Sequence, residues 1–352
     1  MRALFDPASP GATGASPASG RRRVAVLALG GTIAMTSGGD GLVPVAGARR
    51  QLEELGVAWD EIDVLGQDLA QVPSAHLGWG HLRDLADRIG VLARTGGPES
   101  LDGVVVTQGT DLLEDVAFGL DLLLDHDLPV VVTGALRGRD AVSSDAGANL
   151  ANAVVVAADP GARGRGVLVA ANETVHAARS VRKTHTHRLE AFTSPSWGPE
   201  GLVVEGRVIW RGGPRGPRVG LPRAERGWPR VPVLPTGLGD DGMLLDGLLA
   251  SPPDGLVVEA VGAGHVPHAL VDALASLAQS VPVVLCTRVP SGPVLRATYG
   301  YAGSETDLLR RGLLWAGALP AHKARILLVL ALAGGLERGA VEHRLSQLAV
   351  TA

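Results

Sequence analysis

Short apolar runs alternate with longer stretches of helical periodicity along most of the chain. In GWGHLRDLADRIGVLA, Leu82, Leu85, Ile89 and Leu92 recur three or four residues apart, which predicts an amphipathic helix. The runs between such stretches are rich in Val, Leu and Ile and show no polar alternation, as strands buried on both faces do. In the first part of the chain these predicted strands lie at 24–29, 61–66, 101–107, 129–135 and 164–172.

This alternation of strands and helices predicts an α/β fold with mostly parallel sheets. It is interrupted once, by a stretch rich in Pro, Gly and Arg that suits neither a helix nor a strand, and it then resumes. We therefore expect two domains, a larger N-terminal three-layer α/β/α domain and a smaller C-terminal α/β domain with a parallel sheet. The expected boundaries are a disordered tail at 1–21, the first domain at 22–212, a linker at 213–231 and the second domain at 232–352.

Composition and charge exclude several classes of partner and cofactor. The chain has 352 residues, and 32 Lys and Arg against 36 Asp and Glu give a net charge of −4, without a basic field for nucleic acid or a membrane surface. Cys286 is the only cysteine, which excludes an intrachain disulfide framework and a multi-cysteine metal site. His185 and His187 stand two residues apart without a carboxylate partner pattern. We therefore expect no metal and no cofactor.

The apolar runs also bear on location. None is long enough to span a bilayer as a helix. Three arginines precede VAVLAL, but this short run continues into GGTIA instead of a small-residue cleavage site, so a buried strand is favoured over a secretion signal. We expect a cytoplasmic protein with no membrane partner.

Lysine and tyrosine are unusually scarce. Lys183 and Lys323 are the only lysines, and Tyr299 and Tyr301 are the only tyrosines. Both residue types can exchange a proton near neutral pH when their surroundings shift them, whereas arginine stays charged. Lys323 opens the apolar helix ARILLVLALA, so we expect a structural role for it. Lys183 follows a predicted strand, where chemistry is more common.

Reactive side chains follow several of the predicted strands. Thr32 stands in a Gly-Gly-Thr turn after the first strand, Ser74 follows the second, Thr110 and Asp111 follow the third, and Lys183 comes later. Because parallel strands end at the same edge of a sheet, we expect these groups to share one rim. A lysine positioned by a carboxylate can take the proton of a hydroxyl, and backbone N–H groups of the glycine turn can hold an oxyanion. This set is suited to acyl-type hydrolysis.

Each of these residues also has a simpler explanation. Thr110 and Asp111 can cap the following helix, and the Gly-Gly-Thr turn can be only a tight turn. Lys183 can belong to a solvated run of charges with Arg182, His185, His187 and Arg188. A nucleotide-binding oxidoreductase would suit the fold, but LALGGTIA lacks the glycine spacing of that fingerprint.

Six segments give the chain a specific resemblance. In order they are LALGGTIAMT, VVVTQGTDLLED, PVVVTGALRGRDAVSSDAGANLANAV, HAARSVRKTHTHRLEAF, VVEAVGAGHVP and KARILLVLAL. Together they resemble the bacterial asparaginase/glutaminase family over roughly residues 22–335. The resemblance implies a homodimer or homotetramer and the hydrolysis of L-asparagine to L-aspartate and ammonia, without a cofactor.

The resemblance also assigns roles to individual residues. It implies that Thr32 is the nucleophile that forms the acyl-enzyme, and that Thr110, Asp111 and Lys183 form a proton relay. Either threonine could attack first, and we favour Thr32. Asp111 is also implied as the partner of the substrate α-ammonium, and Ser74 as the group that holds the α-carboxylate. The implied substrate-binding residues are Gly31, Ser74, Gln108 and Gly109.

The chain departs from the family pattern at three places. Gln108 replaces a common histidine, and His265 stands where some members have an asparagine from a neighbouring subunit. The loop TSGGDGLVPVAGARR lacks the usual catalytic tyrosine, and Leu42 and Val43 occupy its approximate place. We expect the lid at 38–41 to close nevertheless, because its glycines permit it. A catalytically weakened amino-acid-binding or regulatory homologue, or a preference for L-glutamine, are the alternatives.

Overall fold

The computed structural model describes residues 20–38, 41–44, 47–55, 61–214, 220–224 and 227–351. Most of the predicted tail, the tip of the predicted lid and parts of the predicted linker lie outside the described residues. The larger domain is built on a sheet that has eight strands within these ranges, in the order β12-β11-β8-β7-β6-β5-β1-β4. The strands are β1 (Arg22–Ala28), β4 (Ile62–Asp68), β5 (Gly103–Thr107), β6 (Val130–Thr133), β7 (Val167–Ala171), β8 (Thr174–Ala177), β11 (Gly201–Val204) and β12 (Arg207–Trp210).

One part of this sheet is parallel and the other is antiparallel. The strands β4, β1, β5, β6 and β7 pair in parallel, whereas β8, β11 and β12 continue the sheet in antiparallel register. Every residue of β5 is buried, as its apolar run predicts. The predicted mostly parallel sheet is confirmed, and its antiparallel edge is an addition.

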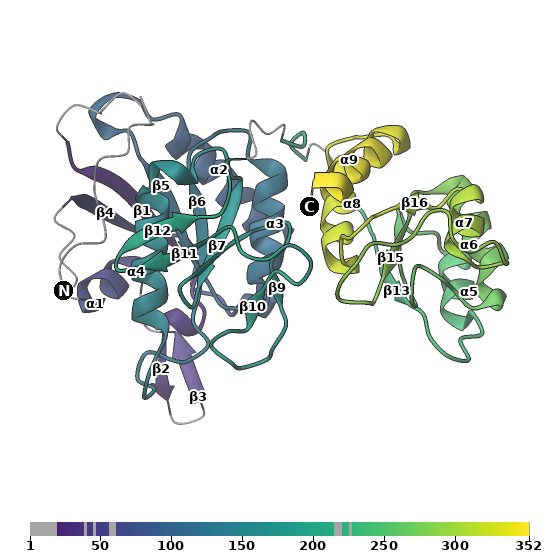
Figure 1. Ribbon diagram of the computed structural model, residues 1–352, viewed down its shortest axis with the longest axis horizontal. Coiled ribbons are helices and arrows are strands. Elements are labelled where there is room, and N and C mark those ends of the chain that lie inside the picture. The colour runs from purple at the N-terminus through teal and green to yellow at the C-terminus, as the bar shows by residue number, and fades with distance from the viewer. Residues whose placement is uncertain are drawn as a thin grey trace, which may run out of the picture.

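Helices cover both faces of the large sheet (Figure 1). The helices α1 (Ala48–Leu55) and α4 (Ala146–Ala158) pack on one face, where Val105 of β5 points. The helices α2 (Trp79–Ala93) and α3 (Leu113–Leu123) pack on the other, together with Val104 and Val106. Successive β5 side chains therefore enter opposite cores, which gives the predicted three layers.

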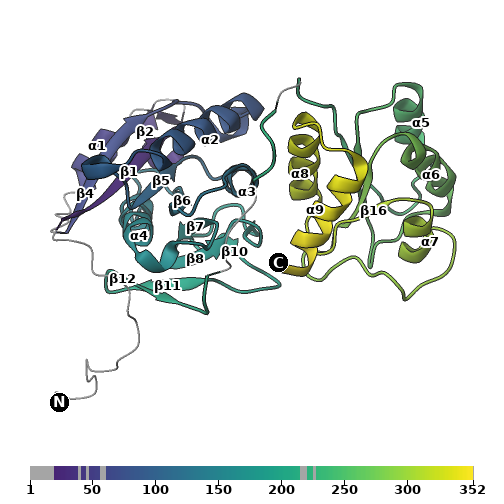
Figure 2. The ribbon, with the colours of Figure 1, turned by 90° about the horizontal axis from the view of Figure 1, so that it is seen from above.

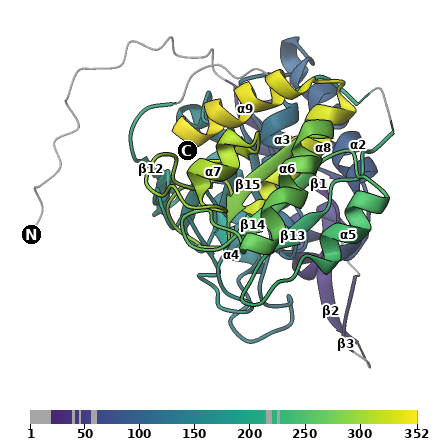
Figure 3. The same cartoon turned by 90° about the vertical axis from the view of Figure 1, so that its right-hand side faces the viewer.

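The smaller domain has its own parallel sheet. Its described strands β13 (Val233–Pro235), β14 (Leu256–Ala260), β15 (Val283–Thr287) and β16 (Leu314–Trp315) lie in this order. The helices α5 (Met243–Ala250), α6 (Val271–Ser280) and α7 (Glu305–Arg310) share one apolar core with this sheet and lie in front of it in Figure 3. The predicted second α/β domain is confirmed.

The other face of the small sheet meets the larger domain. The helices α8 (Ala321–Ala333) and α9 (Arg338–Thr351) lie on the side of the smaller domain that faces the larger one (Figure 2). Helix α8 packs against α3, and a single apolar cluster contains Leu85 and Phe118 of one domain and Val257 and Leu327 of the other. The domain interface is therefore a continuous core.

Short elements extend from the larger domain near the ends of the parallel strands. The 3-10 turn η1 (Thr32–Ala34) leads into a ribbon of β2 (Met35–Gly38) and β3 (Gly41–Pro44), and η2 (Ser74–His76) follows β4. A second ribbon pairs β9 (Arg182–Lys183) with β10 (Phe192–Thr193). The remaining 3-10 turns are η3 (Gly97–Glu99), η4 (Pro160–Ala162) and η5 (His268–Leu270). No described helix is both long and apolar enough to cross a bilayer.

Candidate active site

Two glycine turns touch at the carboxyl ends of the neighbouring strands β1 and β5. Gly31 has a φ of +87°, and a Cβ at this position would lie 1.9 Å from the backbone nitrogen of Gly109. Only glycine permits so close an approach of two backbones. Thr32 and Thr110 are the residues that directly follow these glycines, so the contact brings the two predicted threonine turns together.

Ser74 joins the same contact from the loop after β4. Its hydroxyl donates a hydrogen bond to the carbonyl oxygen of Gly109 at 2.7 Å and accepts one from the backbone N–H of Leu112 at 3.0 Å. The side chain is buried. A serine hydroxyl has one donor and two acceptor positions, so one acceptor position remains after these two bonds. Ser74 therefore holds the Thr110 loop in place.

The predicted relay residues meet around Lys183. The Lys183 Nζ donates to Thr110 Oγ1 at 2.8 Å and lies 3.7 Å from Asp111 Oδ1. The Lys183 side chain is only 17% exposed, whereas that of Asp111 is 64% exposed. Thr110 is buried. A lysine in contact with a threonine hydroxyl, beside an accessible carboxylate, has the geometry for proton transfer.

The simpler explanation for Thr110 and Asp111 does not apply. Helix α3 begins at Leu113 with Leu112 in the N-cap position, and no side chain caps it. Thr110 and Asp111 thus stand before the helix, and their side chains are left for other contacts. Thr32 is half-buried as the first residue of η1, where Ile33 and Ala34 point into the core.

Gln108 has an unusual environment for a predicted polar contact. Its side chain is fully buried, and neither atom of its amide has a hydrogen-bond partner among the described residues. A buried amide without a partner is costly for a folded protein. Such groups are uncommon in native structures and call for a specific explanation.

Glu114 is a charged neighbour of the relay that the sequence analysis missed. Its Oε1 accepts the backbone N–H of Lys183 at 3.1 Å, and its Oε2 lies 3.2 Å from His322 Nε2, 3.7 Å from Arg182 Nε and 3.8 Å from Lys323 Nζ. Burial alone would raise the pKa of Glu114, but the hydrogen bond from His322 and the charge of Lys323 outweigh burial and lower the pKa to about 2. The side chain is therefore a carboxylate at neutral pH.

Lys323 is the second residue of this buried cluster. Its side chain is fully buried, and its Nζ donates to the carbonyl oxygens of Ala178 at 2.8 Å, Arg179 at 3.3 Å and Val181. Burial lowers the pKa of Lys323 to about 8, although the nearby Glu114 carboxylate favours the charged form. The two lysines of the chain thus occupy different surroundings, one beside the relay and one in a ring of backbone carbonyls.

The tyrosines form a separate cluster in the smaller domain. The Tyr301 hydroxyl lies 2.9 Å from His265 Nδ1, and His265 Nε2 lies 3.1 Å from Oε2 of the buried Glu305. The ring of Tyr299 packs edge-on against His265. This hydrogen-bonded chain belongs to the residues around η5 and α7, not to the threonine turns.

The histidines of the 185–187 turn are engaged locally. His185 Nδ1 accepts the backbone N–H groups of His187 and Arg188, both at 3.2 Å. Among the described residues, no group of three His, Cys, Asp or Glu side chains is arranged to hold a metal ion.

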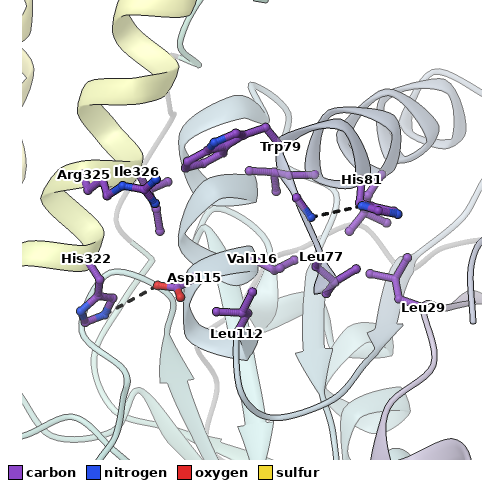
Figure 4. A pocket seen from close by; sticks show the side chains of 13 residues that line it. Leu29, Leu77, Trp79, His81, Leu112, Asp115, Val116, His322, Arg325 and Ile326 are labelled. Carbon is purple, nitrogen blue, oxygen red and sulfur yellow. Dashed lines mark hydrogen bonds and ion pairs between the residues drawn. The ribbon is translucent and has the colours of Figure 1, made fainter. Parts of the chain in front are cut away.

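A cavity of about 270 Å³ lies between α2, α3 and α8 (Figure 4). Leucines, Val116 and Ile326 make up just over half of its lining residues, and Trp79 lies beside Arg325 at one end. His322 and Asp115 face one another across 3.8 Å. Burial raises the pKa of Asp115. The cavity borders the Glu114 cluster through His322, but the two threonines are not among its lining residues.

Comparisons with known proteins agree with the two-domain division. The family model "Asparaginase, N-terminal" matches residues 23–215, and "Glutaminase/Asparaginase C-terminal domain" matches residues 230–345. A probable L-asparaginase of Deinococcus radiodurans is 37% identical over 331 residues, which covers 92% of this chain and 97% of the relative. A glutaminase-asparaginase of Pseudomonas fluorescens is 38% identical over 196 residues, covering 53% of this chain and 52% of the relative.

A solved structure has the same architecture. The crystal structure of a probable cytoplasmic L-asparaginase from Campylobacter jejuni superposes with a TM-score of 0.78 at 31% sequence identity. The match covers 93% of this chain and 99% of that structure. Both domains are therefore shared with that protein.

Proposed function

Because this chain belongs to the asparaginase/glutaminase family of amidohydrolases, we propose that it hydrolyses L-asparagine to L-aspartate and ammonia through a threonine acyl-enzyme. The observation that carries the proposal is the hydrogen bond from Lys183 Nζ to Thr110 Oγ1. The same Nζ lies 3.7 Å from Oδ1 of Asp111. A hydroxyl, an amine and a carboxylate within direct reach of one another can move the protons that amide cleavage requires.

In the proposed first step, Thr32 Oγ attacks the side-chain amide carbon of the substrate. The new C–O bond forms, the C–N bond breaks, and the nitrogen leaves as ammonia after it takes up the hydroxyl proton. Thr110 and Lys183 pass this proton along the relay. Water then attacks the ester, which releases the acid and restores the Thr32 hydroxyl.

Substrate binding is assigned to the groups around the touching turns. Asp111, the most exposed member of the relay, is suited to the α-ammonium group of an amino acid. We assign the α-carboxylate to the loop of Ser74. The Ser74 hydroxyl donates its hydrogen bond to the Gly109 carbonyl in this structure, so it would have to turn toward the substrate to donate to a carboxylate. Gly31 and Gly109 contribute backbone groups near the reacting carbonyl, and Gln108 contributes an amide that has no protein partner among the described residues.

The oligomeric state and the cellular location of the protein are also proposed from its family. We propose a homodimer or homotetramer and a cytoplasmic location. The Campylobacter jejuni structure named above is described as a probable cytoplasmic L-asparaginase. Size-exclusion chromatography with light scattering tests the assembly directly.

An ammonia-release assay with L-asparagine, D-asparagine and L-glutamine side by side tests the substrate. Preference for L-glutamine is the second candidate, supported by the similarity to a glutaminase-asparaginase. One methylene group changes binding by only about 1–3 kcal/mol, so the two substrates have to be compared under identical conditions. Loss of turnover in both Thr32→Ala and Lys183→Met supports the mechanism. Binding of L-asparagine without turnover in the unmodified protein would instead support a regulatory homologue.

A further inference from the structure

Two buried charges outside the proposed relay hold the segment that carries Lys183. Lys323 of the smaller domain binds the chain just before Lys183, and Glu114 binds the backbone of Lys183 itself. We propose that Lys323 and Glu114 are positioning residues that set the distance between Lys183 and Thr110, so that the proton relay depends on the second domain. This inference rests on the proposed function, because it assigns Lys183 to the relay.

Lys323 organises the turn that leads into β9. The carbonyl oxygens of Ala178, Arg179 and Val181 converge on its Nζ. Buried carbonyl groups need donors, and an ammonium group supplies three. The ammonium group thus supplies the hydrogen-bond donors that backbone N–H groups supply to carbonyl oxygens in a strand or a helix. Lys183 follows two residues after Val181, so the turn fixes where β9 begins.

Glu114 connects this turn to the Thr110 loop. Its Oε1 accepts the Lys183 backbone N–H, and it stands only four residues after Thr110, at the start of α3. The chain from Thr110 to Glu114 and the hydrogen bond to Lys183 form one short path between the two relay residues. The distance of 2.8 Å between Lys183 Nζ and Thr110 Oγ1 is set at the end of this path.

The second oxygen of Glu114 explains why the carboxylate keeps its orientation. Oε2 faces His322 and Lys323 from α8 of the smaller domain and Arg182 from β9. Opposite charges on one side of the group leave Oε1 directed toward Lys183. Removal of the Lys323 charge would therefore release both the turn at 178–181 and one of the contacts that orient Glu114.

The location of Lys323 is unfavourable by itself, which argues against a purely packing role. It lies in the first turn of α8, where the helix dipole disfavours cations, and this turn contains no acidic residue. Its side chain is also fully buried. A leucine or methionine would fill the space without either cost. The function of this cation is therefore to bind the three carbonyl oxygens and the Glu114 carboxylate.

The test is a double-mutant cycle between Lys323→Met and Lys183→Met. Methionine keeps much of the lysine shape and removes the charge. We expect Lys323→Met to lower kcat for the preferred amide at least about tenfold with little change in KM, since small misplacements of catalytic groups have effects of this size. In the Lys183→Met background, Lys323→Met should not lower the residual rate further. An equal loss in both backgrounds, or a folded Lys323→Met with kcat within twofold of the unmodified protein, would overturn the inference.

Arg325→Met is the matched control. Arg325 lies two residues further along α8, where it donates to the Val231 carbonyl and stacks over Trp79. Among the described residues, no hydrogen bond or ion pair is seen between its side chain and the 178–183 segment. The Arg325→Met variant, like Lys323→Met, removes a cation from helix α8 at the domain interface. We expect its kcat to stay within about twofold of the unmodified protein, because the relay path is intact. A loss equal to that of Lys323→Met would assign the effect to the interface in general and overturn the inference.

A second pair of variants keeps the inference testable if Lys323→Met does not fold. In Glu114→Gln the amide oxygen can still accept the Lys183 N–H, whereas in Glu114→Ala no acceptor remains. We expect kcat to fall less in the glutamine variant than in the alanine variant. Equal losses in both variants would contradict a role through the Lys183 backbone.

Hydrogen exchange gives a readout that does not require turnover. Peptides covering residues 178–183 should exchange at least about tenfold faster in Lys323→Met, or in Glu114→Ala, than in Arg325→Met, since both remove buried partners of this segment. Unchanged exchange would overturn the inference even if the unmodified protein released no ammonia. Absence of ammonia release with faster exchange would instead overturn the proposed function and the relay with it, while the positioning of Lys183 by Lys323 and Glu114 would stand.

Discussion

Replacement of Gly31 by alanine should force apart the two turns that carry Thr32 and Thr110. The added Cβ would lie 1.9 Å from the Gly109 nitrogen and 2.2 Å from its Cα. These are backbone atoms, which cannot rotate away as a side chain can. The turns must therefore separate by about 1.5 Å to reach ordinary van der Waals contact.

This displacement is large on the scale of catalysis. A misplacement of about 1 Å costs roughly 100-fold in rate, so we expect kcat for L-asparagine to fall by at least that factor. The positive φ of Gly31 adds about 1–2 kcal/mol of backbone strain in an alanine. That strain alone lowers Tm by a few degrees.

Gly206→Ala separates the two effects. Gly206 has a φ of +71° in the same domain, but nothing lies within 4 Å of a Cβ built there. It carries the backbone strain without the collision. The assay is ammonia release at 25 °C together with a thermal melt followed by circular dichroism. A folded Gly31→Ala variant with kcat within threefold of Gly206→Ala would refute the role of the close approach.

Three further predictions concern Ser74, Gln108 and His176. Ser74→Ala removes one buried and one partly buried hydrogen bond, so the free energy of unfolding measured in urea titrations should fall by about 2–4 kcal/mol. An unchanged free energy of unfolding would contradict the role of Ser74 between the loops. Gln108→Leu loses no described protein hydrogen bond, so its Tm should stay equal or rise, while kcat/KM should fall about tenfold. A lower Tm with unchanged kinetics would exclude a contact between Gln108 and the substrate. Burial and the nearby charge of Lys323 lower the pKa of His176 to about 4. The unfolded chain therefore binds the proton more readily than the folded protein, and the free energy of unfolding should fall by about 3 kcal/mol as the pH drops from 6.5 to 4. A His176→Gln variant should show a flatter dependence in urea titrations across this range, and an unchanged slope would contradict this assignment.

The buried strands of the fold could be predicted from sequence because their pattern is local. The apolar runs correspond to β1, β5, β6 and β7, and to β14 and β15 in the smaller domain. The antiparallel strands β11 and β12 were missed. They are the short runs GLVV and RVIW toward the sheet edge, with Leu202 46% and Ile209 58% exposed, so they lack the burial on both faces by which the other strands were predicted.

In the candidate site, too, some residues have a recognisable local sequence pattern and others do not. Thr32, Thr110, Asp111 and Lys183 carry a distinctive order along the chain, and the structure brings the last three together. Glu114 could not be recognised in this way, because an acidic residue in the first turn of a helix is ordinary. Its partners lie 69 residues away at Lys183 and 208 residues away at His322. Contacts between such distant positions leave no local pattern.

The continuous core at the domain interface has a consequence for folding. Helix α8 covers apolar surface of α3 with one face and the small sheet with the other, and it also supplies the donor for the carbonyl ring at 178–181. The larger domain alone would expose Phe118 and neighbouring side chains to water and leave these carbonyls unpaired. The two segments matched by separate family models are therefore not autonomous folding units. The chain should unfold in one cooperative transition, and the contact between Lys183 and Thr110 should form only after the C-terminal helices have been synthesised and docked.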